Sequence, residues 1–146
     1  MNKRFMIVDD LPLPYGTRGI IMKAECRNGV NHGHSRLVKK YGMEGADVNL
    51  ATSWYTAYVV IPPEICDGLG WKSMDAQSYD IPVHGGCTYA RIGWLGGVRI
   101  PEDWLVLGWD YAHYGDTMAE FDLEKVRDEL TEFGEYIRMK IQTHQR

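Results

Sequence analysis

The chain has 146 residues, of which 45% are hydrophobic and 25% are charged, and its formal net charge is −4. These values predict one folded domain over residues 1–146, and they argue against disorder and against a generic nucleic-acid-binding surface. The apolar runs are too short for a signal peptide or a membrane span, and the three cysteines form no paired framework. We therefore expect a cytoplasmic protein with reduced thiols and no membrane partner.

Two strands are predicted near the N-terminus. Residues 4–8 are mostly apolar and stop at two aspartates, and residues 19–26 alternate apolar side chains. The loop that follows contains His32 and His34, a pair too small to define a metal site. Residues 18–40 carry six basic residues against one acidic residue, which fits either a solvated face or contact with an anionic ligand.

The middle of the chain predicts one strand and a long connection. Residues 54–61 are rich in aromatic and β-branched side chains and end at two prolines, which is typical of a strand. Residues 64–77 contain two glycines, so we expect a loop with a brief helical turn. Because long loops often cover sites, Trp71 and Tyr79 are either lid aromatics or packing residues, and packing is the favoured role.

Two more strands and a helix complete the predicted fold. Residues 88–94 and 103–109 read as strands, and the second has two apolar faces, which indicates a strand inside the sheet. Residues 120–142 read as a helix that Asp122 or Thr117 caps. Its apolar stripe consists of Val126, Leu130, Phe133, Ile137 and Ile141. The expected class is α+β, a mainly antiparallel sheet with a C-terminal amphipathic helix packed on it.

Polar residues suited to chemistry gather in two motifs, residues 83–89 and 108–116. The glycines after His84 permit a sharp turn or the close approach of a ligand. Cys87, inside the first motif, is expected to be a small buried hydrophobe rather than a nucleophile. Both motifs lie at the ends of strands expected to be neighbours, so we predict that they converge on one pocket. The predicted chemical residues are His84, Thr88, Asp110, His113 and Asp116.

These residues fit two kinds of catalytic chemistry. His84 and His113 could act as general base and general acid on a phosphodiester, with an aspartate orienting His113 and Thr88 holding the phosphate. The predicted ligand-binding residues are Gly85, Gly86, Tyr89, Trp109, Tyr111 and Tyr58. A divalent metal held by His84, Asp110, His113 and Asp116 is the less favoured alternative, so no cofactor is expected. Binding without catalysis, or a purely structural polar network, fits the same residues.

The two motifs resemble those of small proteins encoded by tailed bacteriophages, which carry His-Gly-Gly-x-Thr-Tyr and Asp-x-Ala-His-x-Gly-Asp patterns. Residues 57–62, 81–89 and 108–116 carry the resemblance, and it extends over the chain from about Trp54 through the helix at 122–142. The sequence departs from the usual family pattern in three places. Those departures are Pro82 before the first motif, Trp109 in place of Phe and Tyr111 in place of Cys.

By analogy, the resemblance implies a counter-defence factor that acts on nucleotide immune signals in an infected bacterial cell. The expected partner is a nucleotide-derived small molecule, and a homo-oligomer is compatible with the sequence. Phosphodiester cleavage of a cyclic nucleotide is the leading expectation for the activity. The alternatives are sequestration of a cyclic dinucleotide or ADP-ribose derivative, and a structural or interaction role.

Overall fold

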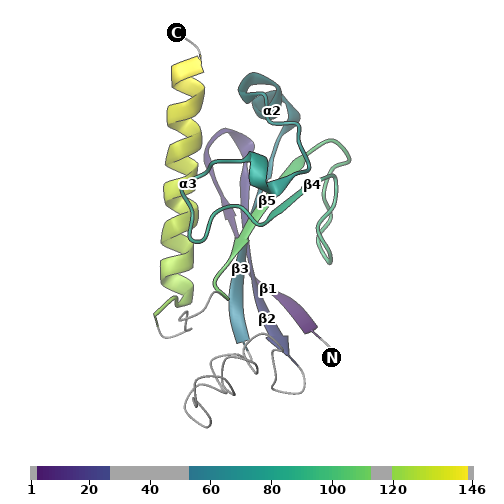
Figure 1. The fold of residues 1–146 in the computed structure, drawn as a ribbon, viewed down its shortest axis with the longest axis vertical. Coiled ribbons are helices and arrows are strands. Elements are labelled where there is room, and N and C mark those ends of the chain that lie inside the picture. The colour runs from purple at the N-terminus through teal and green to yellow at the C-terminus, as the bar shows by residue number, and fades with distance from the viewer. Residues whose placement is uncertain (1–2, 27–52, 113–119, 145–146) are drawn as a thin grey trace.

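The computed structural model describes residues 3–26, 53–112 and 120–144 of the chain. Within them, one antiparallel sheet has the strand order β1-β2-β3-β5-β4, and helix α3 runs along one of its faces (Figure 1). The strands are β1 Lys3–Pro12, β2 Arg18–Cys26, β3 Ser53–Ile61, β4 Tyr89–Ile92 and β5 Leu105–Asp110. The helices are α2 Pro63–Leu69 and α3 Leu123–His144, with 3₁₀ turns η1 Pro14–Gly16 and η3 Ala76–Ser78. The predicted α+β class is confirmed.

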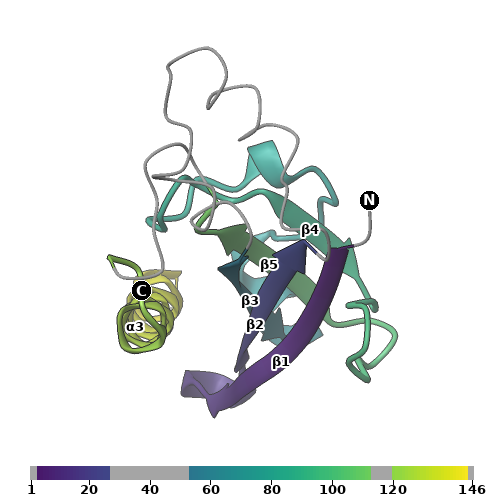
Figure 2. The ribbon, with the colours of Figure 1, turned by 90° about the horizontal axis from the view of Figure 1, so that it is seen from below.

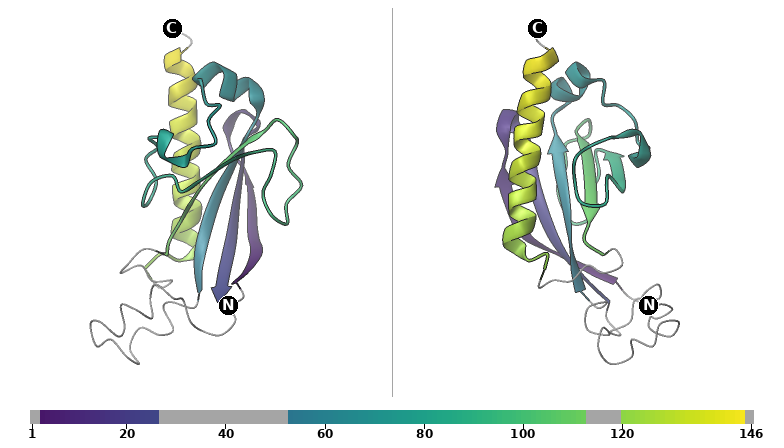
Figure 3. Two further views of the ribbon diagram at one scale, coloured as in Figure 1. Left: turned by 45° about the vertical axis from the view of Figure 1, so that its right-hand side comes forward. Right: turned by 60° about the vertical axis from the view of Figure 1, so that its left-hand side comes forward.

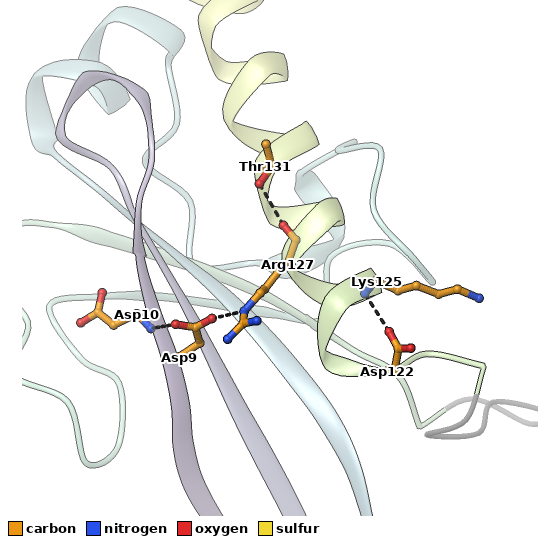
Figure 4. Close-up of polar contacts among 6 residues, drawn as sticks. All are labelled: Asp9, Asp10, Asp122, Lys125, Arg127 and Thr131. Atoms are coloured by element: carbon orange, nitrogen blue, oxygen red, sulfur yellow. Dashed lines mark hydrogen bonds and ion pairs between the residues drawn. The ribbon is translucent and has the colours of Figure 1, made fainter.

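Strand β1 is longer than its sequence predicts, because the two aspartates do not end it. Asp10 forms an ion pair of 2.6 Å with Arg18 on β2. Asp9 pairs with Arg127 on α3 (Figure 4). Both carboxylates are therefore accommodated within the strand by arginines of other elements, 8 residues away for Asp10 and 118 residues away for Asp9. The chain reverses only at η1, where Tyr15 adopts a left-handed conformation with φ of 60°.

Helix α3 covers one face of the sheet (Figure 2), and its predicted stripe belongs to the core between them. Four stripe residues are fully buried, and the fifth is partly buried against the same core. Asp122 caps the helix, as predicted, by accepting a hydrogen bond of 2.9 Å from the Lys125 amide (Figure 4). Gly134 allows η1 to approach the helix, since a Cβ at this position would lie 2.8 Å from Cδ of Pro14. Within the described residues, no helix is long and apolar enough to cross a membrane.

The segment between α2 and β4 joins the same core as α3 (Figure 3). Tyr79 and Ile81 are buried there, and the Trp71 ring meets the Tyr79 ring edge-on at 5.8 Å. Trp71 and Tyr79 are therefore packing residues, in agreement with the favoured expectation. The opposite face of the sheet has its own, smaller core. That core consists of Ile20, Met22, Tyr58, Val60, Leu95 and Val106.

Strand β5 lies inside the sheet, between β3 and β4, as its two apolar faces predict. Leu105, Leu107 and Trp109 point into the core under α3, whereas Val106 points into the smaller core on the other face. Successive side chains of a strand alternate between faces, so Asp110 emerges on the face opposite α3. This alternation determines how the two sequence motifs are distributed in space.

Candidate functional site

A pocket of about 310 Å³ opens on the face of the sheet opposite α3. Its described lining consists of Phe5, Trp54, Thr56, Tyr58, Thr88, Tyr89, Trp109, Asp110 and Ala112. Five of these positions belong to the predicted site: Tyr58, Thr88, Tyr89, Trp109 and Asp110. The indole of Trp109 is buried on the other face, where it packs against Phe133 of α3.

The aromatic walls of the pocket meet because Gly108 has no side chain. Gly108 lies directly opposite Tyr58 on β3 and Tyr89 on β4 in the strand register. A Cβ at Gly108 would lie 2.6 Å from the Tyr58 ring, so this ring lies across the glycine. The Tyr58 and Tyr89 rings then meet edge-on with a centroid distance of 5.4 Å. Such edge-to-face pairs are a favoured aromatic geometry.

One polar pair at the pocket joins the two sequence motifs. Oγ1 of Thr88 lies 3.5 Å from Oδ2 of Asp110, and the Thr88 amide donates to the carbonyl of Gly108 at 2.9 Å. The other carboxylate oxygen, Oδ1 of Asp110, accepts a hydrogen bond of 3.1 Å from the Ala112 amide. The structure thus brings Thr88 and Asp110 together, as the sequence predicts.

The pocket also holds buried hydroxyl groups. The Thr56 hydroxyl belongs to a residue that is 5% exposed, and it makes no hydrogen bond of normal geometry within the described part of the chain. Burial raises the pKa of Tyr58, an effect that the nearby Thr56 hydroxyl partly opposes and the Asp110 charge reinforces. Burial also raises the pKa of Tyr89. Both phenols are therefore protonated near neutral pH and can donate hydrogen bonds.

His84 belongs to a second cluster, on the α3 side of β5. Its ring stacks on Tyr111 with a centroid distance of 5.0 Å and an interplanar angle of 4°, and it packs against Phe121 at 4.4 Å. Oε1 of Glu129 accepts hydrogen bonds from the His84 amide at 2.8 Å and from the Tyr111 hydroxyl at 2.7 Å. The Trp109 indole donates to the same hydroxyl at 2.9 Å. One carboxylate on α3 therefore holds segments of both motifs.

The predicted single pocket is thus divided in two within the described residues. Asp110 and Thr88 face the pocket, while His84 and Tyr111 lie with α3, because Asp110 and Tyr111 are consecutive residues that point to opposite sides of the strand. Spacing in the sequence does not reveal this separation. His113 and Asp116 lie outside the described residues, so their predicted roles remain predictions.

The glycines of the first motif form the turn between the two clusters. Gly85 and Gly86 have φ values of 70° and 77°, which favour glycine, and the Gly86 amide donates to the carbonyl of Val83 at 3.0 Å. Burial raises the pKa of the Cys87 thiol, which makes it a poor nucleophile, as expected. Among the described residues, no group of three potential ligands could hold a metal ion. The predicted metal set includes His113 and Asp116, so this finding leaves it untested.

Sequence reasoning missed several residues of both clusters. Phe5 and Trp54 lie far from the motifs in sequence, and no local signal associates them with the pocket. Thr56 did give a signal, because it is a polar residue within the otherwise apolar and aromatic run of β3. Glu129 lies on the flank of the apolar stripe of α3, where an acidic residue ordinarily faces solvent.

Comparisons of the chain with protein-family models, curated proteins and solved structures found no match. The chemistry of the pocket itself therefore carries the evidence for a function. Its described lining combines aromatic rings with hydroxyl groups and one carboxylate. Such a lining suits a flat ligand that carries hydroxyl or amino groups.

Proposed function

We propose that the protein binds a nucleoside-containing small molecule in this pocket. The observation that carries the proposal is the Thr88–Asp110 pair beside the aromatic walls of Phe5, Trp54, Tyr58 and Tyr89. The volume of about 310 Å³ is at the lower end of small-molecule sites, which run from about 300 to 1,000 Å³. A single base with its sugar fits a pocket of this size better than a whole dinucleotide does.

The polar groups suggest how such a ligand would lie. A carboxylate only accepts hydrogen bonds, so Asp110 is suited to the hydroxyl groups of a ribose. The Tyr58 and Tyr89 phenols can donate to the acceptor atoms of a base, and the rings provide stacking surfaces. The described lining contains no lysine or arginine, so it suits the base and sugar rather than the phosphate groups.

Sequestration is favoured over cleavage in this proposal, because His84 lies in the second cluster, on the other side of β5 from the pocket. The resemblance to phage proteins suggests the biological setting, in which the ligand is a bacterial immune signal and its capture blocks the defence of the host cell. Cyclic dinucleotides and ADP-ribose derivatives are the candidate signals. Cleavage with His84 and His113 as acid and base is the competing activity. Recovery of the ligand after heat denaturation distinguishes the two activities.

The test is calorimetric titration with a cyclic dinucleotide, ADP-ribose, a ribonucleoside and its 2′-deoxy analogue. Asp110→Asn should weaken binding of the ribose ligands by about tenfold or more, since hydrogen bonds to charged groups contribute about 1.5–3 kcal/mol. Asp103→Asn, an exposed aspartate outside the lining, is the matched control and should bind like the wild type. Equal affinities of the two variants for the ribose ligands would show that Asp110 does not contact the ligand.

Heat denaturation followed by chromatography then separates the two activities. Recovery of the intact ligand supports sequestration, whereas recovery of linear or shortened products supports cleavage. If products form, His84→Ala tests whether His84 acts as acid or base from the second cluster: loss of the products would support that role, and unchanged products would exclude it. If no ligand of this panel binds at millimolar concentration, the proposed function is wrong.

A further inference from the structure

The hydroxyl of Thr56 is a buried polar group without a hydrogen bond in the described chain. Thr56 is 5% exposed, and its Oγ1 atom has no partner of normal geometry among the described residues. Burial raises the pKa of Tyr58, and the neighbouring Thr56 hydroxyl opposes this effect without forming such a bond. A hydroxyl withdrawn from water without a partner lowers the stability of a protein. Such a group is expected where function requires it.

The position of Thr56 connects this unpaired hydroxyl with the pocket. Thr56 lines the pocket and pairs directly with Asp110 in the strand register. Opposite side chains on one face of an antiparallel pair have Cβ atoms about 4.5–5.5 Å apart. The Asp110 carboxylate is held by the Ala112 amide at 3.1 Å, and Oγ1 of Thr88 lies 3.5 Å from it. The pocket therefore places a fixed acceptor beside a hydroxyl that can both donate and accept.

This pair of polar groups lies between two aromatic rows of the sheet. Thr56 lies two residues from Trp54 and two residues from Tyr58, so the three side chains emerge on the same face of β3. Successive rows on one face are about 7 Å apart along the strand. A base stacked on a ring of either row would thus place its ribose over Thr56 and Asp110. The two adjacent hydroxyls of a ribose offer a donor to the carboxylate and a second polar group to the threonine.

Given the proposed function, on which this inference rests, we propose that Thr56 and Asp110 together bind the 2′ and 3′ hydroxyls of one ribose. One hydroxyl donates to the Asp110 carboxylate. The other forms a hydrogen bond with the Thr56 hydroxyl, where the ligand takes the place of the Tyr58 phenol as its neighbour. The ligand must then have both hydroxyls free. In a cyclic dinucleotide, one of these two oxygens of each ribose belongs to a phosphodiester. ADP-ribose keeps both on its adenosine ribose, so it represents the favoured class of signal.

The pattern of ligand affinities is tested by calorimetric titration of the wild type. The ligands are the four common ribonucleosides, the 2′-deoxy and 3′-deoxy analogues of the one that binds most tightly, ADP-ribose, and a 3′,5′-linked cyclic dinucleotide. Each deoxy analogue should bind at least about threefold more weakly than its parent, since a neutral hydrogen bond is worth about two- to tenfold in affinity. ADP-ribose should bind more tightly than the cyclic dinucleotide.

Thr56→Val removes the hydroxyl and keeps the size of the side chain. It should weaken binding of the parent ribonucleoside by at least about threefold. It should leave the affinity for one deoxy analogue unchanged, namely the analogue that lacks the hydroxyl bound by Thr56. Thr17→Val is the matched control, because Thr17 is 2% exposed, its hydroxyl likewise lacks a partner among the described residues, and it lies outside the described lining. This variant should bind every ligand like the wild type.

Melting temperatures test the state of the Thr56 hydroxyl without a ligand. Both valine variants should melt at or above the temperature of the wild type, because an unpaired buried hydroxyl is replaced by a methyl group. A lower melting temperature for Thr56→Val alone would show that its hydroxyl has a partner in the free protein, and it would refute the proposal.

Four binding results would also refute it. They are full affinity of Thr56→Val for the parent, an equal loss for the parent and both deoxy analogues, a wild-type affinity that depends on only one of the two hydroxyls, and tighter binding of the cyclic dinucleotide than of ADP-ribose. Each of them leaves the proposed function intact as long as Asp110→Asn weakens binding. If the wild type binds none of these ligands, the proposed function itself is wrong, and this inference falls with it.

Discussion

Gly108→Ala should disrupt the pocket although it adds a single methyl group. That methyl would lie 2.6 and 2.8 Å from two atoms of the Tyr58 ring and 3.1 Å from the carbonyl oxygen of Ala57. The ring must therefore move out of its edge-on contact with Tyr89. Overpacking of a buried site costs about 1–3 kcal/mol, and the aromatic contact is worth about 0.5–1.5 kcal/mol.

An opposing contribution reduces this cost. Replacing glycine within a strand lowers the entropy of the unfolded chain and stabilises by roughly 0.5–1 kcal/mol. Because the overpacking and the lost aromatic contact together exceed this gain, we expect a net destabilisation of about 1–3 kcal/mol. Affinity for a pocket ligand should fall as well, since the Tyr58 and Tyr89 rings form part of the wall.

Urea denaturation followed by circular dichroism measures the free energy of unfolding. The control is Gly68→Ala, because a Cβ at Gly68 meets nothing within 4 Å, and this helical position should gain up to about 1 kcal/mol. In a Tyr58→Ala background, Gly108→Ala should cost at least about 0.5 kcal/mol less than in the wild type. A neutral Gly108→Ala, or a cost independent of residue 58, would refute the steric argument.

Three further predictions concern the core, the second cluster and a buried thiol. Phe133→Ala should lower the free energy of unfolding by about 3–5 kcal/mol, whereas the exposed Met139→Ala should change it by less than about 0.5 kcal/mol in urea denaturation. Tyr111→Phe removes the hydroxyl between Trp109 and Glu129 and should cost about 1–3 kcal/mol; a cost below this range would show that the link is not structural. Burial raises the pKa of Cys66 from 9.0 to about 11, so the folded protein retains a proton that the unfolded chain loses between these values. The contribution of the Cys66 thiol to stability should therefore be constant below about pH 9 and fall by about 2–3 kcal/mol as the pH rises to about 11. Cys66→Ala should remove this part of the pH dependence, and an unchanged pH profile would count against the buried thiol as its source.

Local sequence patterns predicted the elements whose structure depends on near neighbours. The stripe of α3, its Asp122 cap and the two faces of β5 all follow from periodicity or from capping chemistry. Helix α2 was expected as a brief turn, yet Pro63 at its start and left-handed Gly70 at its end are regular helix boundaries. Both boundary residues are visible in the sequence, so the whole of α2 was predictable from it.

Long-range contacts determined what local patterns missed. The extension of β1 depends on arginines from β2 and α3, and the placement of His84 depends on Glu129. The candidate site was therefore only partly predictable. Thr88 and Asp110 meet as expected, but the sequence did not show that β5 separates them from the cluster around His84.

The short strand β4 has a consequence for how long a ligand would stay bound. It has four residues, and within the described sheet it lies at an edge and pairs only with β5, yet it contributes Tyr89 to the pocket and adjoins Thr88. A short edge strand opens locally at a lower free energy than the inner strands β2, β3 and β5. Transient detachment of β4 would remove one wall of the pocket without unfolding the rest of the sheet. The dissociation rate of a ligand would then follow the opening rate of β4, so residence time and affinity could be tuned by separate parts of the molecule.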